Sequence, residues 1–299
     1  VHILLAIYKI KFQIRNTKIE EINLSPMEDK QYKAIVDLIT QILNSAFITN
    51  QQLFILLICK NINLSLKYGY TDSTSMCIPI YAFVIMHSLN LYDDAISFVT
   101  LYNKLKQKYG ASNFEGKNQF ILGSFIEPYQ LFLSSSNRTV AKAFRLCCEV
   151  GDLVYGNYSN LTLVLHTLSE GKSLIEVKKY IQASLSFISR LNISDFSNVA
   201  SFWEYYVECL QDSGVVDLKQ VNIFETQIIN EQNRTEAGFF YASLVQYHYL
   251  SGNFKDAVNA GKKHEIYADY DKGLMSHFSG RFYYALALFN YLPQVPRYK

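Results

Sequence analysis

The sequence predicts an all-α protein built as a stack of helical hairpins. Three observations predict it: helix-breaking residues are scarce, apolar residues recur at helical spacing, and one short opening begins several segments. The chain has 13 glycines and 5 prolines among 299 residues, roughly half their usual shares of about 7% and 5%. Short strands joined by tight turns need more of both residues, so this composition favours long helices.

Apolar residues recur at steps of three or four along three stretches, the spacing that places side chains on one helix face. The three stripes are Ile35, Leu38, Ile39, Ile42 and Leu43; Ala237, Phe240, Tyr241, Leu244 and Tyr247; and Leu274, Phe278, Phe282, Leu286 and Phe289. The two-residue alternation of a half-buried strand is not sustained anywhere. We therefore expect about a dozen helices of roughly 12–18 residues.

Short polar breaks separate these stripes. Examples are residues 69–72, 134–137, 169–172 and 250–253. Several of them supply a residue that can cap a helix start or a glycine that can end a helix. None is long enough to link two domains, so the sequence predicts one continuous helical-repeat domain over residues 1–299.

A recurring helix opening indicates a repeat. Leu91–Ala95 and Asn253–Ala257 both contain an aromatic residue, an acidic residue and a final alanine, and Ser173–Val177 is a weaker copy. The copies lie a little over two units apart for a tetratricopeptide unit of about 34 residues. Such a hairpin cannot bury its apolar face alone, so neighbours must stack on it. We predict an α–α superhelix of degenerate tetratricopeptide-like hairpins, a fold made for contact.

The familiar catalytic and ligand-binding motifs are missing or incomplete. Gly171-Lys172-Ser173 matches the end of a phosphate-binding loop, but His166 stands where its first glycine belongs. The segment Asp269–Gly273 is similar to a calcium loop, yet its glycine is misplaced. The six histidines show no metal-ligand spacing. We therefore expect no catalytic residue, cofactor or metal in this chain.

Charge and cysteine content narrow the class of protein further. The net charge is +2 and no lysine- or arginine-rich block occurs, so nucleic acid is not an expected partner. Five cysteines without a Cys-x-x-Cys pair are typical of buried, reduced thiols. No apolar run reaches the roughly 20 residues that span a bilayer, and no secretory signal opens the chain. We expect a cytoplasmic protein without membrane contact and, because it begins with Val1, an internal piece of a larger chain.

Two dense groups of aromatic residues allow two interpretations. The first is an aromatic groove that anchors a partner peptide, and the second is bulky packing between stacked helices. The candidate partner-binding residues are Phe202, Trp203, Tyr205, Tyr206, Tyr247 and Tyr249.

Several short segments, in a fixed order over about residues 1–290, carry a family resemblance. They are Lys18–Glu21 with Leu24–Met27, Asn63–Gly69, Glu149–Leu153 and Gly252–Ala257. The chain resembles the tetratricopeptide-like region of large bacterial signalling proteins, which join a serine/threonine kinase domain, an AAA-like ATPase and often a sensor histidine kinase. Asn63–Gly69 is the most specific match. The chain departs at residues 70–72, where family members usually carry Pro or Ser.

The resemblance implies a cytoplasmic parent protein with ATP-dependent serine/threonine or histidine kinase activity, whose catalytic modules lie outside these residues. We expect a non-catalytic interaction and regulatory scaffold, with neighbouring kinase or ATPase domains, or another protein, as partners. The alternatives are the sensor arm of an ATPase-type transcription regulator, a stand-alone peptide-binding adaptor, and an enzyme in its own right. The sequence leaves the oligomeric state open.

Overall fold

The computed structural model describes residues 2–191, 196–212 and 217–292. Over these ranges the chain forms fourteen α-helices of 7 to 20 residues and no β-strand. The predicted all-α fold class is confirmed, with slightly more helices than expected. Packing divides the chain into two compact units: unit 1 comprises residues 1–130 and 142–155, and unit 2 comprises residues 131–141 and 156–299. The prediction of a single domain over residues 1–299 stays a prediction.

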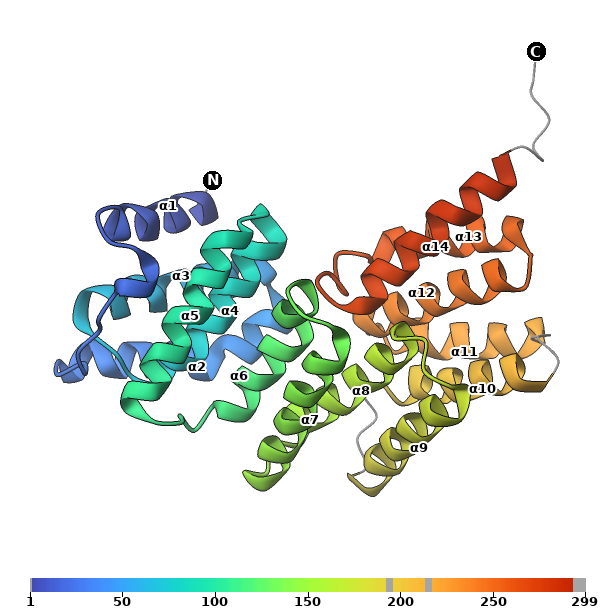
Figure 1. The fold of residues 1–299 in the computed structure, drawn as a ribbon, viewed down its shortest axis with the longest axis horizontal. Coiled ribbons are helices and arrows are strands. Elements are labelled where there is room, and N and C mark those ends of the chain that lie inside the picture. The colour runs from blue at the N-terminus through green and yellow to red at the C-terminus, as the bar shows by residue number, and fades with distance from the viewer. Residues whose placement is uncertain (1, 192–195, 213–216, 293–299) are drawn as a thin grey trace, which may run out of the picture. The chain divides into compact units, whose positions relative to one another are not determined.

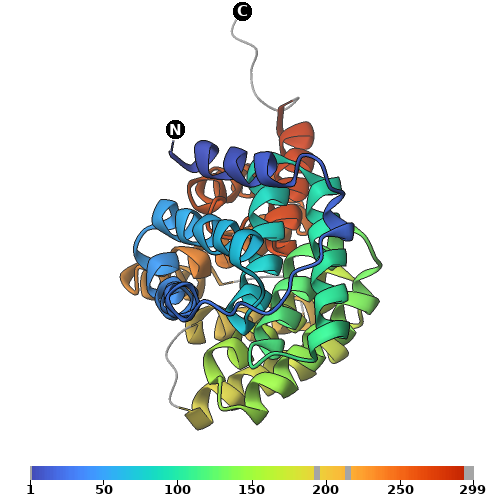
Figure 2. The same ribbon diagram turned by 90° about the vertical axis from the view of Figure 1, so that its left-hand side faces the viewer.

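Unit 1 is a stack of helices in which chain neighbours pack against one another (Figures 1 and 2). Its helices are α1 (His2–Ile14), α2 (Lys30–Thr49), α3 (Gln51–Tyr68), α4 (Asp72–Leu89), α5 (Tyr92–Tyr109) and α6 (Glu115–Ile121), with short helical turns at Ile19–Glu21, Leu122–Ile126 and Glu127–Tyr129. The central helix is α4, which contacts α2, α3, α5 and α6 and is buried over almost its whole length. The first helix, α1, packs on α3.

Unit 2 has the same construction. Its helices are α9 (Leu174–Leu191), α10 (Ser197–Asp212), α11 (Leu218–Asn230), α12 (Arg234–Leu250), α13 (Phe254–Tyr267) and α14 (Met275–Tyr291), while α7 (Leu133–Glu149) and α8 (Leu153–Ser169) contribute residues to both units. The central helix is α12, which contacts α10, α11, α13 and α14 (Figure 1). Its buried Glu236 accepts the backbone N–H of Val199 at 2.8 Å, in the first turn of α10, where a helix offers unpaired donors to a carboxylate.

The three predicted repeat openings all begin helices. The preceding turn contains a residue in the left-handed region each time: Asn90 (φ 56°), Gly171 (φ 65°) and Gly252 (φ 76°). Helices α5, α9 and α13 then start two or three residues later. The last residue of each opening is buried: these residues are Ala95, Val177 and Ala257. Antiparallel stacked hairpins, as predicted, are therefore present within each unit.

The stripes predicted from periodicity have different outcomes. The stripe on α12 is buried throughout. On α2, Ile39 and Leu43 are buried, but Leu38 and Ile42 are exposed. On α14, Phe278, Phe282 and Phe289 share one face, as predicted, yet that face is exposed. Periodicity identifies residues on a common face, whereas burial depends on whether another element covers that face.

Two segments of the family resemblance lie side by side in unit 1. The backbone N–H of Tyr70 donates to the Ser25 carbonyl oxygen at 2.7 Å, and the Met27 N–H donates to the Tyr70 carbonyl oxygen at 2.9 Å. Gly69 precedes this contact with φ 117°, and a Cβ at Gly69 would lie 2.5 Å from the Ser25 carbonyl oxygen. Both the backbone angle and the space therefore require glycine at this position. The resemblance itself stays a prediction.

Replacing Gly69 with alanine is expected to lower the free energy of unfolding by about 2–3 kcal/mol, because strained backbone and a backbone clash add together. Gly110→Ala is the matched control, since Gly110 also has a positive φ (87°) but open space around its Cβ position. The control should cost only about 1 kcal/mol. Urea denaturation measures both values, and equal losses for the two variants would contradict the close packing at Ser25.

Candidate interaction surface

Three of the predicted partner-binding aromatics lie in the interior of unit 2. Phe202, Trp203 and Tyr206 on α10 are buried. Phe202 meets the ring of Phe240 on α12 edge-on, with ring centroids 4.6 Å apart. The Trp203 Nε1–H donates to the Ser243 hydroxyl at 3.0 Å, also on α12. These rings therefore fill the space between α10 and α12, as the packing interpretation expects.

The other three candidates differ in exposure. Tyr247 is buried beside Tyr206, whereas Tyr205 and Tyr249 are half-buried. The Tyr205 hydroxyl accepts the backbone N–H of Asp217 at 2.7 Å, and burial raises the Tyr205 pKa to about 12. In this structure four of the six rings present no surface to a partner. A partner-binding role for these aromatics stays a prediction.

A different set of aromatic residues is exposed on unit 2. On α14, Phe278 is 47% exposed, Phe282 is 59% exposed and Phe289 is 79% exposed. The only charged residue in α14 is Arg281, which forms a two-fold ion pair with Glu265 on α13, at 3.0 and 3.1 Å. We call Phe278, Phe282 and Phe289 the α14 aromatic face.

Comparison with α12 indicates that the α14 aromatic face is uncovered. Both helices are apolar around most of their circumference, a pattern typical of helices enclosed on all sides. Residues 236–245 of α12 are all buried, because other helices surround α12. Among the described residues, α14 contacts mainly α12 and α13. It therefore has the composition of a central helix but the surroundings of an outer one.

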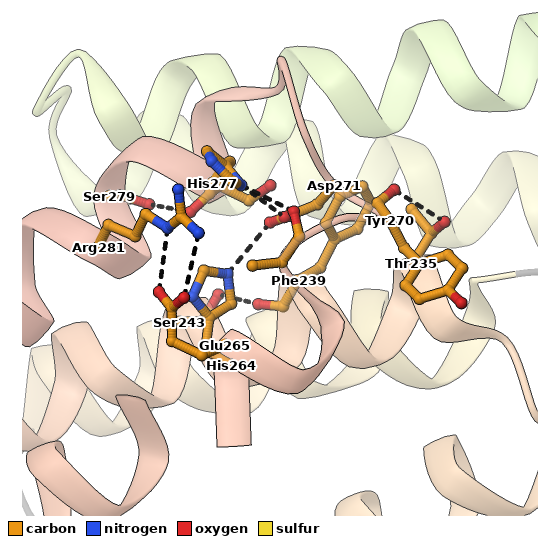
Figure 3. Close-up of polar contacts among 12 residues, drawn as sticks. Thr235, Phe239, Ser243, His264, Glu265, Tyr270, Asp271, His277, Ser279 and Arg281 are labelled. Carbon is orange, nitrogen blue, oxygen red and sulfur yellow. Dashed lines mark hydrogen bonds and ion pairs between the residues drawn. The ribbon is translucent and has the colours of Figure 1, made fainter. Parts of the chain in front are cut away.

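A buried polar cluster fixes α14 against α13. Asp271, in the turn between these helices, is fully buried, and Figure 3 shows its carboxylate between two imidazole rings. His264 Nε2 on α13 lies 3.3 Å from Asp271 Oδ2. His277 Nδ1 on α14 lies 3.2 Å from Asp271 Oδ1 and 2.9 Å from the Ala268 carbonyl oxygen. Since the carboxylate and carbonyl oxygens accept hydrogen bonds, His264 Nε2 and His277 Nδ1 must each carry a proton.

This cluster governs the charge of Asp271. Burial alone would raise the Asp271 pKa, but the hydrogen bonds and charges of His264 and His277 outweigh burial and lower the pKa below its ordinary value. The carboxylate is therefore ionised at neutral pH and forms the hub of the turn. His264 Nδ1 is buried without a hydrogen-bond partner among the described residues. The cluster joins two helices but offers no accessible group to a substrate.

Glycine and ring pairs bring α13 and α14 close together on both sides of the cluster. A Cβ at Gly280 of α14 would lie 2.6 Å from Cε1 of His264. In the opposite direction, a Cβ at Gly261 of α13 would lie 2.1 Å from a ring carbon of Tyr284. Each glycine thus leaves room for a ring of the other helix. The position of the α14 aromatic face is set by these contacts, because they fix the rotation of α14 about its axis.

Unit 1 also has an exposed apolar face, on α1. Ile7 and Ile10 are buried, while Leu4, Leu5, Tyr8 and Phe12 are exposed. We call these four residues the α1 face. The guanidinium of Arg15 lies 3.7 Å from the centre of the Phe12 ring, a favourable cation–π contact. Helix α1 is therefore apolar on two faces, of which unit 1 covers one.

The chemistry available elsewhere in the described residues is limited. Burial raises the pKa of Cys59, Cys77 and Cys147 to about 12 in each case, so these thiols stay protonated and are poor nucleophiles at neutral pH. No group of three or more His, Cys, Asp or Glu side chains in the described ranges is placed to hold a metal ion. Gly171 lies in the turn between α8 and α9, and Asp269 and Asp271 lie in the turn between α13 and α14.

Within the part of the chain that the structure describes, no helix is both long and apolar enough to cross a bilayer. No protein-family model matches the sequence, and no curated protein matches it significantly. The exposed faces of α1 and α14 are thus the strongest candidate sites, and their roles follow from their own geometry and chemistry.

Proposed function

We propose that this chain is a non-catalytic interaction and regulatory scaffold of a signal-transducing kinase or ATPase. In this proposal the stacked helices hold another protein segment, either a neighbouring domain or a separate partner, on the α14 aromatic face. The kinase and ATPase context is drawn from the family resemblance of the four quoted segments. The binding role is drawn from the exposed faces of the helices.

The observation that carries the proposal is the half-covered state of α14. Three phenylalanine side chains on one face, each about half exposed or more, make an apolar surface, and the charge of α14 beside it, Arg281, is paired with Glu265. Burying such side chains releases roughly 1.5–3 kcal/mol each when they are fully covered. An exposed apolar surface of this kind is characteristic of a binding site. Aromatic side chains are also the residues that contribute most to the affinity of interfaces.

A scaffold relays a signal only if its partner binds one state of the stack more tightly than another. The contacts between α13 and α14 provide a defined position for the aromatic face, since Asp271, His264 and His277 join the two helices. A segment that binds this face would favour the arrangement in which the cluster is intact. Coupling to an attached kinase or ATPase would follow from that preference.

The test is the double variant Phe278→Ser, Phe282→Ser in the complete protein. Partner binding, or the regulated change in kinase or ATPase rate, should fall at least about tenfold, because two central apolar contacts are lost. Ile266→Ser is the control, since Ile266 is an exposed apolar residue on α13 outside the aromatic face. Both proteins should unfold within about 0.5 kcal/mol of the original, as is usual for surface changes. Unchanged binding and regulation in the double variant would overturn the proposal.

A further inference from the structure

The α1 face differs from the α14 aromatic face in its charge. Residues 2–19 contain Lys9, Lys11, Arg15 and Lys18 and no Asp or Glu. At about 100° per residue, Lys9 and Lys11 fall on opposite edges of the exposed apolar arc formed by Leu4, Leu5, Tyr8 and Phe12. The α1 face is therefore an apolar stripe with a cation along each edge.

The cations of α1 are only partly neutralised within unit 1. Lys11 forms an ion pair with Asp94 of α5 at 3.0 Å, and both side chains remain substantially exposed. Arg15 stacks on Phe12 at the end of the helix. Lys9 is exposed on the other edge. The surface thus has positive potential beside exposed Leu and aromatic side chains, a combination that favours an apolar partner carrying carboxylates.

The shape and charge of the α1 face select among three occupants. A second copy of the chain would bring the lysines of two α1 faces together, which like-charge repulsion opposes. An anionic lipid surface would cover only a short apolar stripe, because the distance along the helix from Leu4 to Phe12 is about 12 Å. Another amphipathic helix fits best, because helix side chains at i, i+4 spacing interlock with those of a neighbouring helix.

We propose that the α1 face binds an acidic amphipathic helix, with its apolar side chains between Leu4 and Phe12 and its carboxylates paired with Lys9 and Lys11. This inference rests on the proposed scaffold function but concerns a separate surface in the other unit. Binding at α1 should therefore survive the double variant Phe278→Ser, Phe282→Ser. Failure of peptide binding at α1 would overturn only this inference, and failure of partner binding at the α14 aromatic face would overturn only the proposed function.

The experiment uses the 299-residue chain and two designed, fluorescently labelled helical peptides. One peptide carries leucine along one face and glutamate at both edges, and the other carries lysine in place of each glutamate. Fluorescence anisotropy should show at least about tenfold tighter binding of the acidic peptide. Added salt should weaken that binding, because part of it is between exposed charges. Vesicles with and without phosphatidylserine, tested by sedimentation, report on lipid binding.

Substitutions in α1 test whether the acidic peptide binds at the α1 face. Tyr8→Ser with Phe12→Ser should abolish binding of the acidic peptide, and Lys9→Glu should weaken it severalfold. Lys33→Glu is the matched control, because it makes the same charge change on the exposed part of α2 and should leave binding unchanged. Circular dichroism and urea unfolding establish that each variant is folded. Equal binding of both peptides, binding insensitive to the α1 variants, no peptide binding, or binding to anionic vesicles alone would each overturn the inference.

Discussion

Replacing Asp271 with alanine is expected to lower the free energy of unfolding by about 3–5 kcal/mol, the usual cost of removing one partner from a buried ionic contact. Asp271 is fully buried and is the common acceptor of His264 and His277. Without the carboxylate, His264 Nε2–H loses its hydrogen-bond partner in the interior, and His277 Nδ1–H keeps only the Ala268 carbonyl oxygen. Leaving buried donors unpaired is costly in itself.

The control for this prediction is Asp269→Ala, two residues away in the same turn. Asp269 is exposed, so the control removes the same charge with little change in unfolding free energy. Urea denaturation at neutral pH measures both variants. A loss for Asp271→Ala no larger than that of the control would mean that the polar cluster does not join α13 to α14. Because this cluster orients the α14 aromatic face, Asp271→Ala should also weaken partner binding at that face.

The protein is expected to lose about 3 kcal/mol of stability between pH 7 and pH 4 through His166 alone. Burial lowers the pKa of His166 from 6.5 to about 4, because the interior of unit 2 disfavours the charged imidazole. As the pH falls below 6.5, the unfolded chain binds a proton that the folded chain does not bind until about pH 4. Each unit of pKa difference is worth about 1.4 kcal/mol, so stability declines across this window.

His166→Gln is the variant that tests this pH dependence, and His2→Gln, at an exposed histidine, is its control. His166 Nδ1 lies 2.9 Å from the Asn137 Oδ1, a contact that glutamine can partly replace. The variant should show a flatter stability profile between pH 7 and pH 4, whatever its stability at pH 7. Burial also lowers the pKa of His248, so some slope will remain. A profile with the same slope as that of the control would exclude His166 as the cause.

Asp271 contributes in a different pH range. Its folded-state pKa is lower than its ordinary value, so its contribution to stability is present above about pH 4 and is lost as the pH falls through the lowered pKa. The loss between pH 7 and pH 4 is therefore assigned to the buried histidines rather than to this carboxylate. Asp271→Ala should lower the whole curve, and the variant should lack the loss of stability that accompanies protonation of this carboxylate below about pH 4.

Local pattern predicted the helical class and the hairpin openings well, because both depend on residues close in sequence. The scarcity of glycine and proline, the helical period and the opening Asn253–Ala257 each have a direct counterpart in the structure. The α14 stripe shows the limit of this reasoning. Phe278 and Phe282 share a face because of their spacing, but no local pattern states which element covers that face.

The Asp271 cluster could not be predicted from motif spacing. His264 lies seven residues before Asp271 and His277 lies six residues after it, so neither pair has the i, i+4 spacing of one helix. The three residues meet only because α13 and α14 pack closely at Gly261 and Gly280. A histidine on each side of a turn that contains an aspartate was the one signal in the sequence. The segment Asp269–Gly273, whose misplaced glycine argues against a calcium loop, lies in the turn between α13 and α14.

The dense aromatic group at Phe202–Tyr206 illustrates a related ambiguity. Aromatic residues are common both in binding grooves and between packed helices, so composition alone allowed both interpretations. Burial of Phe202, Trp203 and Tyr206 against α12 decides their position in the fold. The exposed aromatic residues of unit 2 include instead those of α14, which the sequence placed on one helix face.

The central claim is that the α14 aromatic face is a binding surface that the working protein covers. Thiol labelling of a Phe282→Cys variant, followed by mass spectrometry at that position, tests it most directly. In the 299-residue chain alone, Cys at position 282 should react quickly, since Phe282 is 59% exposed. When the proposed partner is bound, the account predicts at least about tenfold slower labelling at this position, with an Ile266→Cys control unchanged. Equal labelling rates in the two states would contradict the account.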